Sequence, residues 1–597
     1  MHGALINGSG PAGPTTTLGH QPSSELVNGN KTEQSARQFH SNSNNASALE
    51  TLGPAAKLTD ADPSEIPPAS GPGGRQNAVT INDILERRAK AGRLIAPTAS
   101  YSDSDMFKGP QVGKPKSKSM EHHLSPESLS RHPCSLKQAA RHLKTPGLIS
   151  LGGGLPCAEY FPIDSITLKV PIPPNFSEAA TSSSGAEVRI GKYDVTDPAI
   201  QGTYDLSIAL NYAQATGSAQ LSRFVTEHTE LVHNPPYSDW RSCLTIGSTG
   251  ALEQALRMLC DGPGRGDCLL TEEYSFATAL ETAGPLGIKV VGVKMDEQGL
   301  LPEAMDELLS GWKPEEREGR RKPHVLYTVP SGQNPTGATQ GLERRRELYE
   351  VARKHDVFVI EDEPYYYIQM PLETAGSTAT AGQEGKEETV DQFIASLVPS
   401  LLSMDVDGRV LRMDSFSKVV VPGSRVGWVT ASEEIIERFI RHAEVCNQGP
   451  SGISQVVLYK LLDEQWGHEG YFKWLMNLRG EYTKRRDTMV AAVEKFLPKE
   501  VVSWSVPVSG MFYWLKVDHT QHPGIQAGKA ILEVEEEIYN SCIAKGVLVA
   551  RGSWFRAEQD TEPNELFFRA TFAAATAENM TEAIRRFGEA VRESFKL

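Results

Sequence analysis

The chain has 597 residues, of which 39% are hydrophobic and 23% are charged, and its formal net charge is −15. This composition is typical of a soluble globular protein, and the length allows more than one domain. The acidic balance disfavours broad binding to nucleic acid or to an anionic membrane, so we expect neither partner.

Seven cysteines are scattered along the chain without a CxxC pair. This pattern disfavours a zinc site, so we expect no metal, and the sparse, odd number favours a reducing compartment. We find no apolar run of about 18 residues, as a membrane helix requires. There is no signal-peptide core, and the lack of arginine before Arg37 disfavours a transit peptide. The expected location is the cytoplasm.

Residues 1–120 are expected to form a mostly disordered extension. The first 75 or so are rich in Gly, Ser, Asn, Pro and Thr, and such a segment buries too little apolar area to offset chain entropy. Residues 79–93 instead predict a short helix, which either packs on the domain surface or binds a partner. A polar tether is expected over about 97–120.

The predicted helix near 79–93 has two kinds of residues on opposite sides. Asn82 or Asp83 is expected to help start it. Its apolar stripe is formed by Ile81, Ile84 and Leu85, and the opposite side by Arg87, Arg88 and Lys90.

From about residue 145, apolar runs of strand length alternate with helical segments, including Ala251–Cys260 and Leu342–His355. Continuous β-branched runs separated by helices predict an α/β fold with a mostly parallel, doubly wound sheet covered on both faces. The predicted strands are Cys243–Ile246, Cys268–Thr271, Ile288–Val293, Val325–Val329, Val357–Glu361, Val410–Met413 and Val426–Thr430.

The C-terminal part of the chain has a different pattern of predicted helices and strands. Residues 433–497 look helical, with a long helix from about Gly470, and the last hundred residues mix short strands with helices. This mixture predicts a smaller α+β domain, with strands Met511–Val517 and Leu566–Thr571 and helices Gly528–Ala544 and Ala577–Phe595. The expected domains are an N-terminal arm (121–190), a large domain (191–470, with an exposed insertion near 372–391) and a small domain (471–597).

The strongest local signal is Ser415-Phe-Ser-Lys418, which follows a predicted strand, with Arg425 seven residues later. A desolvated lysine has a lowered pKa and a free amine that attacks aldehydes. The two hydroxyls and the arginine suit a phosphate group, because arginine offers a fork of donors. Taken alone, the segment also fits a surface lysine in a serine-rich turn.

Two further groups of polar residues follow predicted strands. Asn334 lies in the turn-rich segment Pro330–Gly337, at a strand end where α/β sheets bind ligands. Asp362 comes after a buried run, where a carboxylate would keep a heterocyclic nitrogen protonated. Tyr365 would donate to a ring oxygen. The alternative is that these acids cap a helix start.

The segment Gly247-Ser-Thr-Gly250 stands at a strand-to-helix junction. The free N–H groups and the positive dipole end of a helix start bind anions, although a single such turn is weak evidence. The order along the chain is an anion-binding turn, then Asn, Asp, Lys and Arg, each beside a predicted strand end. This order predicts one assembled cofactor site.

The ordered segments resemble fold type I pyridoxal-phosphate (PLP) aminotransferases, in particular the fungal aromatic and the kynurenine/α-aminoadipate aminotransferases. The resemblance covers roughly residues 125–597, and the 28-residue step from Asn334 to Asp362 matches the family. The segments that carry it are Ser150–Pro156, Gly247–Gly250, Gln333–Gly337, Glu361–Tyr365, Ser415–Lys418, Gly423–Gly427 and Phe568–Phe572.

The resemblance implies roles around the cofactor PLP. Lys418 would hold it covalently and then move the substrate's Cα proton, and Asp362 would pair with the pyridinium nitrogen. Asn334 and Tyr365 would bind the ring oxygen. The phosphate would be held by Ser248, Thr249, Ser415, Ser417 and Arg425.

The resemblance also implies a substrate site and a partner. Arg569 would bind the substrate's α-carboxylate, with Asn334 as a second contact to it, and Gly154 would line the substrate side. Tyr212 resembles the family tyrosine that reaches the phosphate of the other subunit. We therefore expect a homodimer with shared active sites.

Two positions depart from the family pattern. The aromatic residue that stacks on the cofactor ring is usually tyrosine, whereas the aligned position here is Phe276, unless Tyr274 takes its place. Cys157 lies in a loop that contacts the substrate in relatives, where a polar residue is often found. This loop therefore predicts substrate specificity less well than the other segments.

The implied activity is a ping-pong transamination of an aromatic L-amino acid (Phe, Tyr or Trp) with 2-oxoglutarate. Small-molecule amino acids and 2-oxo acids are then the partners, with kynurenine or 2-aminoadipate as alternative donors. β-Elimination or decarboxylation with the same cofactor stays open. A PLP-fold transcription regulator is a distant alternative, because residues 1–120 show no basic recognition helix.

Overall fold

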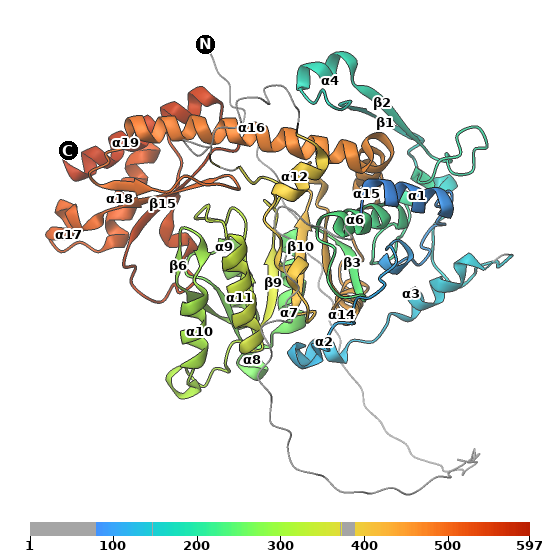
Figure 1. Ribbon diagram of the computed structural model, residues 1–597, viewed down its shortest axis with the longest axis horizontal. Coiled ribbons are helices and arrows are strands. Elements are labelled where there is room, and N and C mark those ends of the chain that lie inside the picture. Colours follow the sequence, from blue (N-terminus) through green and yellow to red (C-terminus); the bar gives the residue numbers. More distant parts are fainter. Residues whose placement is uncertain (1–78, 146, 371, 373–387) are drawn as a thin grey trace, which may run out of the picture. The chain divides into compact units, whose positions relative to one another are not determined.

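The computed structural model describes residues 79–145, 147–370, 372 and 388–597 (Figure 1). The predicted disordered segment up to residue 75 and most of the predicted 372–391 insertion lie outside the described residues. The predicted insertion overlaps the start of helix α12 (Val390–Ser396), which begins with a capping box at Thr389. Among the described residues, none of the helices has the length and hydropathy needed to cross a membrane.

A seven-stranded sheet forms the centre of the large domain, and the prediction of a mostly parallel sheet is confirmed. Four neighbouring pairs are parallel, whereas β11 pairs antiparallel with both of its neighbours. The strand order is β3 (Trp240–Thr245), β11 (Gly427–Ser432), β10 (Val410–Ser415), β9 (Phe358–Asp362), β8 (Val325–Thr328), β4 (Cys268–Glu272) and β5 (Lys289–Val293).

Helices cover both faces of this sheet, which explains why its strands are continuous apolar runs. Neighbouring residues of β9 belong to different cores. Ile360 packs with α7 (Ser248–Leu259) and α14 (Glu433–Ala443), whereas Val359 packs with α10 (Pro302–Ser310) and α11 (Leu342–Lys354). Every residue of β9 and β10 is buried. The large-domain helices include α6 (Ala219–Val232), α7 (Ser248–Leu259), α9 (Ala277–Ala283), α10 (Pro302–Ser310), α11 (Leu342–Lys354), α13 (Leu401–Met404) and α14 (Glu433–Ala443).

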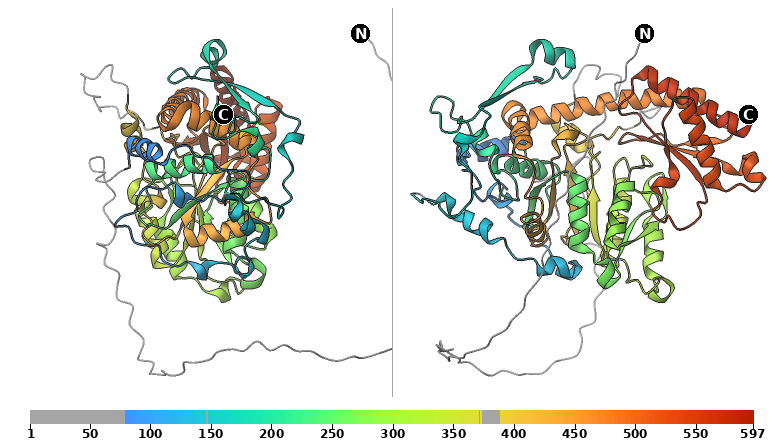
Figure 2. Two further views of the ribbon diagram at one scale, coloured as in Figure 1. Left: turned by 90° about the vertical axis from the view of Figure 1, so that its right-hand side faces the viewer. Right: turned by 180° about the vertical axis from the view of Figure 1, so that it is seen from behind.

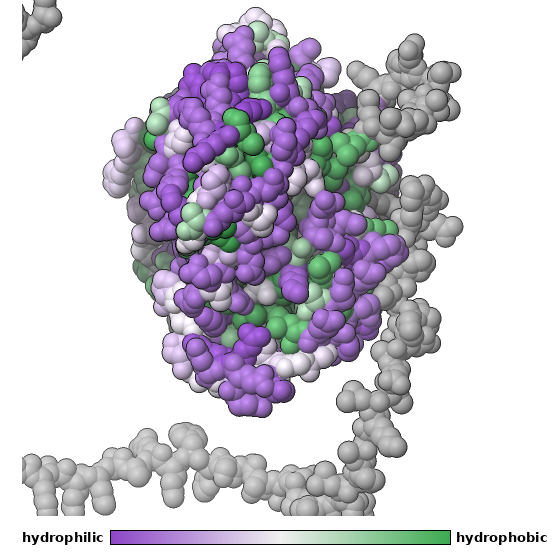
Figure 3. Space-filling view, turned by 90° about the vertical axis from the view of Figure 1, so that its left-hand side faces the viewer, coloured by the Kyte–Doolittle hydropathy of each residue, from purple (hydrophilic) through white to green (hydrophobic). Residues whose placement is uncertain are grey.

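The C-terminal residues form the predicted smaller α+β domain around a four-stranded antiparallel sheet. Its order is β12 (Val502–Trp504), β13 (Phe512–Val517), β15 (Leu566–Thr571) and β14 (Ala550–Arg551). Helices α18 (Ile531–Ala544) and α19 (Ala577–Phe595) bury apolar stripes against it. The face over these helices is mostly hydrophilic with scattered apolar residues (Figure 3), as expected for amphipathic helices.

One long helix, α16 (Gly467–Phe496), extends from the large domain to the small sheet (Figures 1 and 2). It continues from α15 (Gly452–Tyr459) through a π-helical turn, η9 (Lys460–Trp466), and packs against α19. The domain boundary predicted at residue 470 therefore falls inside the first turn of a continuous helix.

The predicted short helix exists as α1 (Ile81–Ala91), and it packs on the large domain. Thr80 is the N-cap and forms a capping box with Asp83, so Asp83 helps to start the helix as expected, whereas Asn82 is not the cap. Ile84 is fully buried among α6 residues, whereas Leu85 is 55% exposed. The packing interpretation is thus the one that the structure supports.

Two of the basic residues predicted opposite the apolar stripe of α1 form ion pairs with the large domain. Arg87 binds Glu230 at 2.7 Å, and Arg88 binds Glu227 and Asp463. These carboxylates are almost fully buried, and a buried carboxylate needs a cation close to it. Charge pairing therefore turns one basic edge of α1 inwards.

Residues 97–144 are in close contact with the large domain, where a loose polar tether and a small-domain arm were expected. Ser104 exchanges hydrogen bonds with the backbone of Ser242, and Cys134 donates its N–H to Glu444. Further along, α2 (Pro126–Ser130) contacts α7, and α3 (Ser135–Ala139) follows. Polar backbone pairing, which composition does not reveal, orders this segment.

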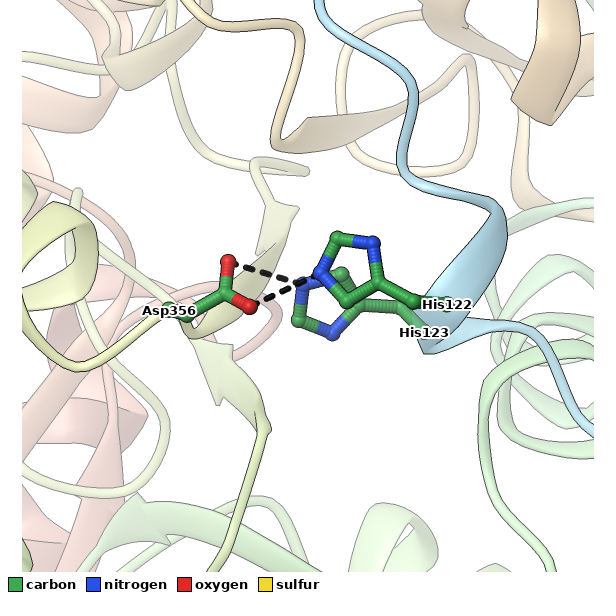
Figure 4. A group of neighbouring side chains, drawn as sticks. All are labelled: His122, His123 and Asp356. Atoms are coloured by element: carbon green, nitrogen blue, oxygen red, sulfur yellow. Dashed lines mark hydrogen bonds and ion pairs between the residues drawn. The ribbon is translucent and has the colours of Figure 1, made fainter. Parts of the chain in front are cut away.

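A histidine pair fixes the same segment to the turn between α11 and β9. His122 Nε2 and His123 Nε2 lie 2.8 and 3.2 Å from the two carboxylate oxygens of Asp356 (Figure 4). These ligand atoms lie within 4.8 Å of one another, a spacing that suits a divalent cation. Arg409 already places a positive charge 3.4 Å from the carboxylate, so we interpret the group as an ion-paired anchor.

The predicted N-terminal arm contains a hairpin that the sequence pattern did not reveal. Strands β1 (Ser165–Val170) and β2 (Ala186–Gly191) pair antiparallel and enclose α4 (Glu178–Ser184). Much of the hairpin is exposed, so its strands lack the continuous apolar runs of the central sheet. Further short α-helices are α5 (Leu206–Ala209), α8 (Gly262–Arg265) and α17 (Pro523–Gln526).

Replacing Ile84 with alanine should loosen α1, because a buried Ile→Ala change costs about 2–5 kcal/mol. Hydrogen exchange of the α1 amides should then become faster than in the unmodified protein. Leu85→Ala, on the exposed side of the same helix, is the control and should leave exchange nearly unchanged. Equal exchange in both variants would show that burial of Ile84 does not hold the helix.

Candidate active site

Three of the predicted site residues lie at the carboxyl ends of three adjacent parallel strands. Asn334 follows β8, Asp362 ends β9, and Lys418 follows β10. Since carboxyl ends of parallel strands meet at one edge of the sheet, these residues form a common site.

Asp362 is the buried acid of the site. Its side chain accepts a hydrogen bond at Oδ2 from the Tyr327 hydroxyl, at 2.9 Å. Oδ1 is buried and makes no hydrogen bond to the described residues, although the Ser248 hydroxyl is near enough to lower the pKa. Burial raises the pKa of Asp362 to about 7. The carboxyl group therefore has one oxygen free for a cationic partner.

Lys418 is accessible to solvent, and the surrounding protein partly desolvates its ammonium group. This desolvation lowers the pKa of Lys418, and the positive charges of Arg569 and Arg425 lower it further. A lowered pKa increases the fraction of free amine, which is the nucleophilic form.

Serine and arginine side chains form a polar cradle beside the start of α7. Ser415 Oγ donates to Ser417 Oγ at 2.8 Å, and Arg425 donates to Ser417 at 3.2 Å. The guanidinium also lies against Gly247, where a Cβ would come within 2.5 Å of Arg425 Nη2. The first N–H groups of α7, at Ser248 and Thr249, lack intrahelical partners. The cradle has the donors that a phosphate needs.

Arg569 and Asn334 come together from the two domains. Arg569 lies on β15 and donates to Asn334 Oδ1 at 2.7 Å. Its guanidinium lies 4.5 Å from the ring centroid of Phe512 and 4.7 Å from that of Phe555. This aromatic pair restricts the guanidinium and leaves it suited to a carboxylate.

Tyr365 is buried, whereas Phe276 is only partly buried. Tyr365 is 4% exposed, and burial together with the nearby Asp362 charge raises the pKa of its hydroxyl. Phe276 is partly buried at the start of α9. The ring of Tyr274 instead packs edge-on against Trp514 and Phe567 of the small domain, which favours Phe276 as the stacking residue.

Tyr212 and Gly154 face open space in the single chain. Tyr212 is 56% exposed, and a Cβ at Gly154 would meet no atom within 4 Å. The arm around Gly154 also exposes large apolar residues, with Ile149 at 87% and Leu151 at 94%. Neither predicted residue is therefore brought into the site by one chain.

The residues fit pyridoxal phosphate. The free, buried Oδ1 of Asp362 suits a protonated ring nitrogen, and the hydroxyls and guanidinium near Arg425 suit its phosphate. The lysine with a lowered pKa is within electrostatic reach of Arg425 in the cradle and of Arg569.

Three residues of the site belong to none of the predicted motifs. Tyr327 stands within an apolar strand and looks like an ordinary core residue, as do Phe512 and Phe555. A buried tyrosine hydroxyl needs a partner, and this rule is the signal that points to Tyr327.

Known proteins resemble the chain closely. Residues 203–587 match the family model described as aminotransferase class I and II. An aromatic amino acid aminotransferase of Schizosaccharomyces pombe is 44% identical over 494 residues, which cover 80% of this chain and 99% of the relative. An L-tyrosine:2-oxoglutarate aminotransferase of Serpula lacrymans is 32% identical, covering 80% of this chain and 96% of the relative.

A solved structure supports the same relationship. The crystal structure of the aminotransferase Aro8 from Candida albicans superimposes with a TM-score of 0.72 at 39% identity, covering 81% of this chain and 100% of that chain. The chain therefore belongs to the aminotransferase class I and II family, and it is a pyridoxal-phosphate-dependent aminotransferase.

Proposed function

We propose that this aminotransferase moves the amino group of an aromatic L-amino acid to 2-oxoglutarate, giving the aromatic 2-oxo acid and glutamate. The observation that carries the proposal is Arg569, a carboxylate-binding group held by Asn334 between the rings of Phe512 and Phe555. The names of the two relatives, an aromatic and a tyrosine:2-oxoglutarate aminotransferase, support the same substrates.

When bound, pyridoxal phosphate supplies an aldehyde for the amino nitrogen and a ring that accepts the electrons released at Cα. Arg569 and Asn334 bind the substrate's α-carboxylate and so fix the direction of the Cα–H bond. Lys418 Nζ takes the Cα proton, because its lowered pKa leaves part of it as free amine.

The remaining residues hold and tune the cofactor in this proposal. Asp362 Oδ1 keeps the ring nitrogen protonated, Asn334 and Tyr365 bind the ring oxygen, and Phe276 stacks on the ring. Gly154 leaves space on the substrate side. The phosphate is held by Ser248, Thr249, Ser415, Ser417 and Arg425, together with Tyr212 of a second copy of the chain.

The proposal includes a homodimer in the cytoplasm. The exposed apolar arm with Ile149 and Leu151, and the half-exposed Tyr212, support a partner subunit at this face. All seven cysteines are free, which supports a reducing compartment.

Transamination of aromatic donors is tested by the visible spectrum of the loaded enzyme. L-Phenylalanine should remove the absorption band of the lysine-bound cofactor, and 2-oxoglutarate should restore it, because the two half-reactions are opposite in direction. A band that responds only to kynurenine or 2-aminoadipate would contradict aromatic specificity. Product analysis that finds ammonia or carbon dioxide in place of glutamate would contradict transamination.

Shared active sites are tested by mixing two inactive variants, Lys418→Ala and Tyr212→Ala. In a mixed dimer, one site combines an intact Lys418 with an intact Tyr212 from the other subunit. After dissociation and reassociation, activity should therefore return to roughly a quarter of that of the unmodified enzyme, since half the dimers are mixed and each has one intact site. Activity that stays absent, while mixed dimers are detected by mass, would place Tyr212 outside the partner's site.

A further inference from the structure

The Tyr327 hydroxyl donates a hydrogen bond to Asp362, a contact that no sequence motif predicts. It lies on β8, and β8 pairs in parallel with β9, whose last residue is Asp362. The Tyr327 side chain is completely buried, and its hydroxyl lies 2.9 Å from Asp362 Oδ2. Within the described part of the chain, this is the one hydrogen bond to the Asp362 side chain that meets ordinary distance limits.

We propose that Tyr327 is a positioning residue of the aminotransferase, which orients the Asp362 carboxylate and keeps it charged so that Oδ1 pairs with the cofactor ring nitrogen. This inference rests on the proposed role of Asp362. Tyr327 itself touches neither the substrate nor the reacting atoms in this account. It acts through the carboxylate.

The need for such a donor follows from the surroundings of Asp362. Burial favours the neutral carboxyl group, and the negative charge of Asp414 adds to this effect. Arg412 offers limited compensation, because it already binds both oxygens of Asp414 at 2.8 Å. The hydrogen bond from Tyr327 is the largest influence that lowers the pKa of Asp362, ahead of Ser248 and Arg412.

The hydrogen bond also fixes which oxygen is free. A carboxylate without a bound partner can turn about its last torsion, which is broad and roughly two-fold. With Oδ2 held by Tyr327, Oδ1 remains without a hydrogen bond and buried. A fixed, unpaired acceptor of this kind binds a ring N–H more strongly than a mobile one, because it loses less conformational entropy on binding.

The chain offers a matched control for a purely structural role. Tyr349 is also buried, at 1% exposure, and its hydroxyl donates to buried Asp405, likewise at 2.9 Å. This pair lies between α11 and the residues before β10, away from the proposed cofactor residues. Tyr327→Phe and Tyr349→Phe therefore each remove one hydroxyl from a buried Tyr–Asp pair.

The test measures cofactor affinity of the apoenzyme by fluorescence titration, with PLP and with its 1-deaza analogue, in which carbon replaces the ring nitrogen. Tyr327→Phe should weaken PLP binding about tenfold or more, as expected for a lost hydrogen bond to a charged group. Binding of the deaza analogue should change little, because that analogue has no ring nitrogen to pair. Tyr349→Phe should bind both compounds like the unmodified enzyme.

The pH dependence gives a second measurement. Removing the Tyr327 hydroxyl raises the pKa of Asp362, so the carboxylate becomes protonated at a higher pH as acid is added. The acid-side loss of PLP affinity should therefore begin at higher pH in Tyr327→Phe. In an Asp362→Asn background, the same substitution should have no further effect, because the charge on which it acts is gone.

The outcomes separate the two proposals. The role of Tyr327 would be overturned if Tyr327→Phe and Tyr349→Phe had the same PLP affinity and lost it over the same acid pH range. It would also be overturned if Tyr327→Phe lost affinity equally for PLP and for the deaza analogue. Failure of the unmodified apoenzyme to bind PLP would instead overturn the proposed cofactor site itself.

Discussion

A carboxylate can stay charged inside a protein only if hydrogen bonds or a cation compensate for the lost water. Asp362 satisfies this condition on one oxygen, through Tyr327, and leaves the other without a hydrogen bond to the described residues. Parallel pairing of β8, β9 and β10 fixes this carboxyl group next to the loops of Asn334 and Lys418. In the proposed site, the ring nitrogen of the cofactor would supply the missing positive charge.

Two arginines act electrostatically on Lys418, and each has a separate role in the proposed mechanism. Arg425 belongs to the cradle of serine and arginine side chains, and Arg569 contacts Asn334. The two guanidinium groups suit the phosphate of the cofactor and the carboxylate of the substrate. Partial burial, and then the repulsion from these two guanidinium groups, lowers the pKa of Lys418 and so increases the share of free amine.

Much of this could be predicted from the sequence, because strands buried on both faces are continuous apolar runs and because parallel strands bring their ends together. The strand Leu566–Thr571 and the helix Ala577–Phe595 have the predicted bounds. The contact between Arg569 and Asn334 depends on how two domains pack, which no local pattern records. The inward arginines of α1 likewise depend on partners such as Glu230, far along the chain.

The most direct test of the account is the identity of the lysine that holds the cofactor. The enzyme loaded with PLP is reduced with borohydride, which fixes the lysine–cofactor bond, and is then digested and analysed by mass spectrometry. The account predicts a pyridoxyl group on the peptide that contains Lys418. A stoichiometric pyridoxyl group on a different lysine, with Lys418 unmodified, would contradict it.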